Sequence, residues 1–179
     1  MKVRPWLRHY DNGVPEQIVY PRYTLHDLFF QSAQKFPDKI CIRYGEVEYT
    51  YSETDRLIRL FAKSLMAIGV QPGQRIGLVL PNCPEFVIAY YAALLAGAVV
   101  VPLNPVYTLS ELDVQVRKTQ VEVIIGWRNR IELIRQLTEK SGISKLIVCE
   151  GIDQKFFFQR VRRTNPRGLV DMSEYTFAE

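Results

Sequence analysis

A short basic loop at residues 126–130 contains the side chains best suited to bind a nucleotide. It reads Gly-Trp-Arg-Asn-Arg after an apolar run, and it brings Trp127, Arg128 and Arg130 close together in the chain. Guanidinium groups bind phosphate through paired hydrogen bonds, and an indole can stack on an adenine-like ring. The other interpretation is a solvated basic loop with Trp127 half-buried. The loop by itself does not decide between the two.

Two carboxylates and three thiols are the other candidates for chemistry. Glu85 and Glu111 each fall in the first turn of an expected helix, where a negative charge complements the helix dipole, so a structural role is sufficient for both. Cys41, Cys83 and Cys149 are an odd number without paired spacing, and the two histidines are distant. We therefore expect no disulfide framework, no metal site and a reducing, cytoplasmic location. We identify no catalytic residue.

The composition is that of a globular protein and excludes a disordered chain. The 179 residues are 47% hydrophobic and 23% charged, a length and balance that suit one domain. A net charge of +4 is too small to indicate nucleic-acid binding. The positive charge is concentrated, because residues 126–170 hold ten Lys/Arg against four Asp/Glu.

The first part of the chain predicts helices around a hairpin. Thr24, with an acid three residues later, is expected to cap one helix, and Ser52 with Asp55 is expected to cap a second. Between them, Lys39–Tyr44 and Val47–Tyr51 read as two short strands around a Gly-Glu turn.

The rest of the chain alternates short apolar strands with helices of about three turns. We expect strands at Arg75–Leu80, Ala98–Leu103, Val121–Ile125 and Lys145–Cys149, and helices at Pro84–Ala96, Leu109–Thr119 and Arg130–Ser141. Continuous apolar strands of this kind are buried on both faces of a parallel sheet. The pattern predicts an α/β fold: an open, mostly parallel sheet with helices on both faces, plus a small N-terminal hairpin.

One uncharged stretch could be mistaken for a membrane span. Phe86–Ser110 contains no charged residue, but Gly97 interrupts it, β-branched residues follow, and Pro102 ends the apolar run. A span needs about 20 apolar residues in one helix. We therefore interpret the stretch as a buried helix followed by a buried strand.

Three parts of the chain differ in character. We expect residues 1–23 to form an extended arm and residues 24–150 to form the α/β unit. Residues 151–179 are expected to form a basic, irregular segment that leads to a truncated end. Within the last part, the basic and aromatic stretch Lys155–Arg163 suits either contact with an anionic membrane surface or a solvated helix face. The sequence is compatible with a homodimer but does not predict one.

Ligands in open α/β sheets bind outside the carboxyl ends of the strands. Four loops meet that condition, namely Pro81–Glu85, Asn104–Thr108, Gly126–Arg130 and Glu150–Asp153. The third of these is the basic loop described above.

Several short motifs, in a fixed order, carry a resemblance to a known family. They are Phe36-Pro-Asp-Lys39, Tyr49-Thr-Tyr-Ser-Glu53, Gly69-Val-Gln-Pro-Gly-Gln-Arg75, Leu80-Pro-Asn-Cys-Pro-Glu-Phe86, Leu95-Ala-Gly-Ala-Val-Val-Val-Pro-Leu-Asn-Pro105 and Tyr107-Thr-Leu-Ser-Glu-Leu112. From about residue 24 to 126 the sequence resembles the N-terminal part of the adenylate-forming acyl-CoA synthetase superfamily, the AMP-binding enzymes. Arg4-Pro-Trp-Leu7 and the loop Asn104–Thr108 are most similar to long-chain fatty-acid–CoA ligases. Thr54 departs from the family's usual leucine.

The resemblance implies a two-step ligase reaction. A fatty-acid carboxylate attacks the α-phosphate of ATP with Mg2+, which gives an acyl-adenylate and pyrophosphate, and the thiol of CoA then displaces AMP. ATP, Mg2+ and CoA are therefore the implied cofactors of a full-length enzyme. The resemblance also implies that Arg128 and Arg130 meet the nucleotide end of CoA, because basic residues on the corresponding loop do so in some relatives.

The same resemblance implies motifs that these residues do not contain. They include the Ser/Thr/Gly-rich phosphate loop, the adenine and Mg2+ motif, the ribose-binding aspartate and the C-terminal domain with its catalytic lysine. We therefore expect an inactive N-terminal fragment that binds no cofactor tightly by itself. Two alternatives remain: a stand-alone flavodoxin-like nucleotide-binding or interaction module, and an aryl-CoA ligase or amino-acid adenylation enzyme of the same superfamily.

Overall fold

Four parallel strands form the centre of the molecule. The computed structural model describes residues 4–149. The sheet contains β3 (Arg75–Val79), β4 (Val99–Pro102), β5 (Val123–Trp127) and β6 (Lys145–Cys149), in the order β4-β3-β5-β6, and every neighbouring pair is parallel. The predicted parallel sheet is confirmed. The strands are apolar because the sheet is covered on both sides.

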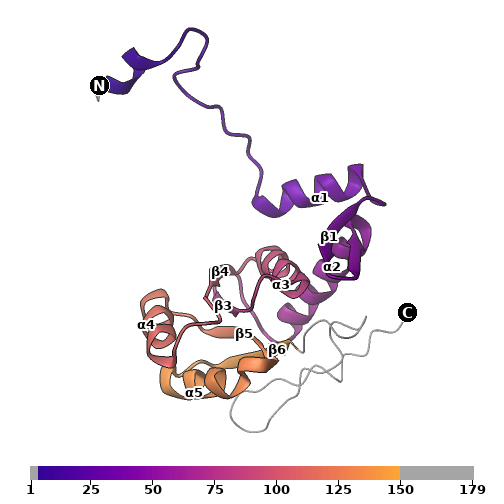
Figure 1. Cartoon of the computed structure of the whole chain (residues 1–179), viewed down its shortest axis with the longest axis vertical. Coiled ribbons are helices and arrows are strands. Elements are labelled where there is room, and N and C mark those ends of the chain that lie inside the picture. Colours follow the sequence, from indigo (N-terminus) through magenta and orange to yellow (C-terminus); the bar gives the residue numbers. More distant parts are fainter. Residues whose placement is uncertain (1–3, 150–179) are drawn as a thin grey trace.

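Helices cover both faces of this sheet. Figure 1 shows α2 (Tyr51–Ala67) and α3 (Pro84–Leu95) on one side, and α4 (Leu109–Thr119) and α5 (Ile131–Ser141) on the other. Alternate strand residues divide between the two faces, as a pleated strand requires. In β5, Ile125 packs into the α2–α3 core, whereas Ile124 packs into the α4–α5 core, and both are fully buried.

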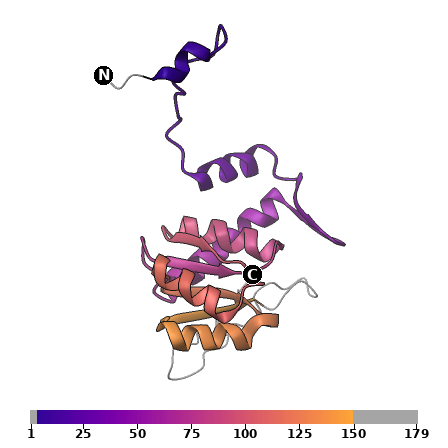
Figure 2. The same ribbon diagram turned by 60° about the vertical axis from the view of Figure 1, so that its left-hand side comes forward.

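A hairpin and a further helix adjoin the α2–α3 face. Helix α1 (Leu25–Lys35) buries Phe29 and Ala33 against it, and β1 (Ile40–Tyr44) pairs antiparallel with β2 (Val47–Thr50). The predicted hairpin and the predicted cap at Thr24 are confirmed, since the Thr24 hydroxyl accepts from the Asp27 amide. The arm before α1 contains a 3-10 turn at Pro5–His9 and runs away from the sheet in both views (Figure 1; Figure 2).

The predicted start of the second helix is wrong by two residues. Thr50, not Ser52, is the N-cap of α2: the Thr50 amide donates to a Glu53 carboxylate oxygen at 2.8 Å, and the Glu53 amide donates to the Thr50 hydroxyl at 3.2 Å. The sequence contains two overlapping capping-box patterns, and the hydrogen bonds that Thr50 exchanges with Glu53 show which of them begins the helix. Asp55 instead pairs with Arg59 at 2.9 Å.

The third predicted strand also begins later than expected. The sequence predicts a strand from Val121, but β5 starts at Val123. Helix α4 ends in the left-handed conformation at Gln120, with φ at 53°, and the Val121 amide donates back to the Val116 carbonyl at 3.1 Å. Val121 therefore closes the helix end instead of joining the strand.

The uncharged stretch breaks into a helix and a strand, as predicted, but the strand is not buried, because β4 lies at the edge of the sheet and Val99 is exposed. Phe86–Ser110 contains most of α3, strand β4 and the start of α4, with the first break at Gly97. None of the described helices combines the length and apolar character that crossing a bilayer requires. The stretch Lys155–Arg163 and the loop Glu150–Asp153 lie outside the described residues.

Candidate functional site

Three of the four predicted strand-end loops meet at one edge of the sheet. Because β3, β4 and β5 are parallel, the chain leaves all three at the same side, and each loop leads directly into a helix. The basic loop following β5 forms a short 3-10 turn, Arg128–Arg130, before α5. This edge therefore gathers backbone N–H groups from several helix starts, an arrangement that favours negatively charged ligands.

Arg130 fixes the basic loop to its neighbour. Its Nη2 donates to the Tyr107 carbonyl at 2.8 Å, which joins the loop after β5 to the loop after β4. Its Nε is buried and has no hydrogen-bond partner. A buried N–H without an acceptor is energetically costly, so this guanidinium is suited to receive an oxygen atom.

A surface hollow of about 260 Å³ lies beside this arginine at the start of α5. Residues Asn129 to Leu133 line it, and they include Glu132. The Glu132 carboxylate is paired with Arg135 at 3.1 Å, so its charge is partly offset. The helix start and Arg130 together make the hollow a candidate anion site.

Trp127 does not join Arg130 in a single binding surface. The indole is half-buried and packs against the α2–α3 core. Arg130 instead contacts the loop whose Tyr107 packs against the α4–α5 core. The half-burial of Trp127 agrees with the solvated-loop interpretation, but the buried Nε of Arg130 does not. Arg128 is half-buried on the same 3-10 turn.

The two candidate carboxylates have different environments. Glu111 forms a capping box with Thr108, whose amide donates to Glu111 Oε2 at 2.8 Å. Glu85 lies in the first turn of α3 but is only 3% exposed. The Cys83 thiol is hydrogen-bonded to the Glu85 side chain, and Glu85 Oε2 has no partner.

The burial of Glu85 could have been recognised in the sequence. Glu85, Ile88, Ala89 and Ala92 follow helical spacing, and all four are buried on the inner face of α3. Its position in the first turn alone does not reveal which face of the helix it occupies.

The cysteines near this edge are poor nucleophiles. Burial, followed by the hydrogen bond to Glu85, raises the pKa of Cys83 to about 12. Burial also raises the pKa of Cys149. The thiolate is the reactive form, so neither thiol is activated. Among residues 4–149, no three His, Cys, Asp or Glu side chains are placed to hold a metal ion together.

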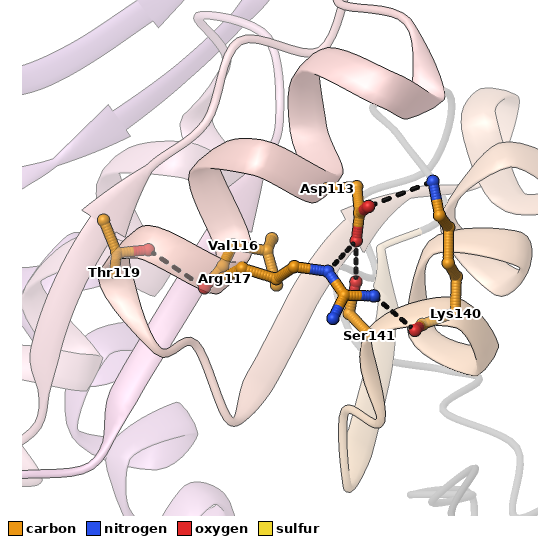
Figure 3. A network of polar contacts seen from close by, with 6 residues as sticks. All are labelled: Asp113, Val116, Arg117, Thr119, Lys140 and Ser141. Carbon is orange, nitrogen blue, oxygen red and sulfur yellow. Dashed lines mark hydrogen bonds and ion pairs between the residues drawn. The ribbon is translucent and has the colours of Figure 1, made fainter.

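A polar network that the sequence analysis missed connects α4 to α5 (Figure 3). Asp113 accepts from Arg117 Nε at 2.8 Å and from the Ser141 hydroxyl at 2.7 Å, and Lys140 Nζ lies 3.0 Å from its other oxygen. Arg117 also donates to the Lys140 carbonyl at 2.8 Å. The i,i+4 spacing of Asp113 and Arg117 was visible in the sequence, but the contact with α5 was not.

Comparison with known proteins decides the family. The model of the family described as AMP-binding enzyme matches residues 29–165. The chain belongs to the AMP-binding enzyme family. A long-chain-fatty-acid–CoA ligase of Bacillus subtilis (strain 168) is 43% identical over 124 residues, which are 68% of this chain and 22% of that protein. A 4-coumarate–CoA ligase of Arabidopsis thaliana is 32% identical over 76% of this chain and 24% of that protein.

Solved structures of AMP-binding enzymes share the fold. A long-chain-fatty-acid–CoA ligase from Archaeoglobus fulgidus has a TM-score of 0.70 at 24% identity, over 80% of this chain and 30% of that chain. A benzoate–CoA ligase from Burkholderia xenovorans has a TM-score of 0.67 at 25% identity, over 72% and 26%. The chain spans about a quarter of the length of the curated relatives that it matches.

The AMP-binding motifs recognised in the sequence occupy structural junctions. Tyr49–Glu53 ends β2 and starts α2, as expected. Gly97 lies between α3 and β4 with φ at +76°, a conformation in which a side chain is strained. These motifs thus lie where the chain passes between a helix and a strand.

Proposed function

We propose that this chain forms the N-terminal part of an ATP-dependent fatty-acid–CoA ligase. The observation that carries the proposal is 43% identity to a protein named a long-chain-fatty-acid–CoA ligase. The reaction would convert a fatty acid, ATP and CoA into acyl-CoA, AMP and pyrophosphate, with Mg2+. By itself the chain is proposed to be inactive, because the phosphate-binding motifs expected from the resemblance are not among its residues.

The proposed division of the chain follows the fold. Residues 24–150 would be the N-terminal α/β subdomain, preceded by an arm at 1–23 and followed by a basic segment at 151–179. The shared cores of α1 to α5 support the subdomain. Three free thiols support a cytoplasmic location. Membrane contact through Lys155–Arg163 and a homodimer remain predictions.

Arg128 and Arg130 are proposed to bind the nucleotide end of CoA. The support is geometric: both lie at the carboxyl edge of the sheet, and the unpartnered Nε of Arg130 suits a phosphate oxygen. Replacing both with alanine in a full-length ligase that carries this segment should raise the KM for CoA at least about tenfold, since each charge-assisted hydrogen bond contributes about 1.5–3 kcal/mol.

The first half-reaction serves as the control for this test. Adenylation does not use CoA, so acid-dependent ATP–pyrophosphate exchange should be unchanged in the double variant. Arg130→Lys keeps the charge but lacks the planar fork, so it separates charge from geometry. An unchanged KM for CoA in the double variant would refute these two residues without refuting the ligase.

An aromatic acid is the second candidate substrate. It is supported by the 32% identity to a protein named 4-coumarate–CoA ligase. A panel of palmitate, 4-coumarate and benzoate distinguishes the two, and we expect the highest kcat/KM for palmitate. A preference for either aromatic acid would transfer the proposal to the aryl class.

A further inference from the structure

Glu85 carries a buried oxygen atom that accepts no hydrogen bond from any residue in the described range 4–149. Of the described residues, only Glu85 and Arg130 have a buried side-chain nitrogen or oxygen without a hydrogen-bond partner. Arg130 belongs to the proposed CoA site, whereas Glu85 lies in a different loop, at the start of α3. None of the ion pairs among residues 4–149 includes Glu85.

The arrangement is unfavourable for the isolated chain. A carboxylate taken out of water loses its hydration, and one weak thiol donor from Cys83 does not replace it. Glu111 has the usual environment of an acid in the first turn of a helix. Its side chain is exposed and accepts hydrogen bonds from the amide and the hydroxyl of Thr108. Glu85 is the exception, and polar groups that reduce stability tend to be kept for function.

The surroundings of Glu85 indicate what is missing. Cys149 and Tyr49 lie close to it: after burial, the nearby charge of Glu85 raises the pKa of both groups. None of these neighbours is a cation. Tyr49 is half-buried on the hairpin strand β2.

We propose that Glu85 Oε2 accepts a hydrogen bond from an arginine or lysine that lies outside these 179 residues in the full-length enzyme. The proposal rests on the proposed function, because it requires the remaining three quarters of a ligase of the relatives' length. Glu85 is then a positioning residue that anchors the carboxyl edge of this sheet to the rest of the protein. A buried, negatively charged acceptor at this edge is the complement of such a cation.

The test compares one substitution in two contexts. Glu85→Met removes the charge and keeps the volume, and we expect it to raise the Tm of the isolated chain by about 3 °C or more. In a chimera that joins this chain to the remainder of the Bacillus subtilis ligase, the same substitution should lower the Tm. Glu111→Met is the matched control and should lower the Tm in both contexts.

A change of sign between the two contexts is the required result. A lower Tm in the isolated chain would mean that the oxygen is already partnered there, and a higher Tm in both would mean that no cation meets it; either overturns the proposal. If Glu85→Met prevents folding of the chimera, Glu85→Gln should show a smaller shift in the same direction. A folded chimera without ligase activity would contradict the proposed function, while the Tm shifts would still report on Glu85.

Discussion

Asp113 is the residue at which the two helices on one face of the sheet are tied together. Hydrogen bonds from Ser141 and Lys140, and then the contacts with Arg117, lower the pKa of this carboxyl from 3.8 to about 2. Because the pKa is lower in the folded state, the stabilisation is present above about pH 4 and is lost as the pH falls towards 2.

Asp113→Asn should therefore make unfolding less dependent on pH. The Tm of the variant should be lower than that of the original chain at pH 7, and the difference should shrink as the pH falls from about 4 towards 2, because the carboxyl then becomes protonated in the folded state as well as in the unfolded state. Thermal unfolding followed by circular dichroism between pH 7 and pH 2 measures this. A constant difference in Tm across the range would contradict it.

The three thiols should react in an order set by their burial. Cys41 is half-buried, whereas Cys83 and Cys149 are buried, and burial raises the pKa of all three. We expect a thiol-labelling reagent at pH 8 to modify Cys41 first and the other two only on unfolding. Mass spectrometry of peptides after timed labelling identifies each site, and early modification of Cys83 would show that it is accessible.

Single residues also show what sequence alone could not provide. Trp127 and Arg130 are three positions apart, yet Trp127 packs against the α2–α3 core, whereas Arg130 donates to the Tyr107 carbonyl of the loop after β4. The contact between Asp113 and Ser141 joins residues 28 positions apart, and no local pattern predicts it. The sequence gives the residue types of the basic loop, but it does not predict how their side chains are arranged in space.

At the scale of elements, periodicity predicted the existence and order of the strands and helices in the sheet. The boundaries failed where two local signals competed. Thr50 and Ser52 both begin a capping pattern, and the backbone bonds of Thr50 with Glu53 decide between them. Val121 is a β-branched residue typical of a strand, but its amide closes the end of the preceding helix. Such competition is resolved by hydrogen bonds that residue types alone do not reveal.

The N-cap of α2 gives a direct test of this boundary. Thr50→Ala should lower the free energy of unfolding by about 1 kcal/mol, because it removes the acceptor for the Glu53 amide. Ser52→Ala should have a smaller effect, since Ser52 caps nothing. Urea unfolding of the two variants measures both losses of unfolding free energy. A larger loss for Ser52→Ala would support Ser52 as the N-cap, as predicted from the sequence.

The passage from α3 to β4 depends on Gly97. Gly97→Ala should destabilise the fold by more than about 1 kcal/mol, because φ is +76° and the new Cβ would lie 3.1 Å from Pro72 Cβ. Gly142→Ala is the control: φ is +68° there, but nothing lies within 4 Å of the added atom. Equal losses in the two variants would show that contact with Pro72 is unimportant.

For the whole molecule, family membership explains why a well-packed α/β unit leaves buried polar atoms unpartnered. The fold is that of the AMP-binding enzymes, and the chain spans about a quarter of their length. Arg130 and Glu85 both lie where strand-end loops gather, and each has a buried polar atom that no residue of the described part of the chain contacts by a hydrogen bond. The proposed CoA site would account for the first, and the proposed contact with the rest of a ligase would account for the second.

Acid-dependent ATP–pyrophosphate exchange with palmitate tests the central claim most directly. The isolated chain should give no exchange, and a folded chimera with the remainder of the Bacillus subtilis ligase should give it and should form acyl-CoA when CoA is added. Exchange by the isolated chain, or its absence from the folded chimera, would contradict the account.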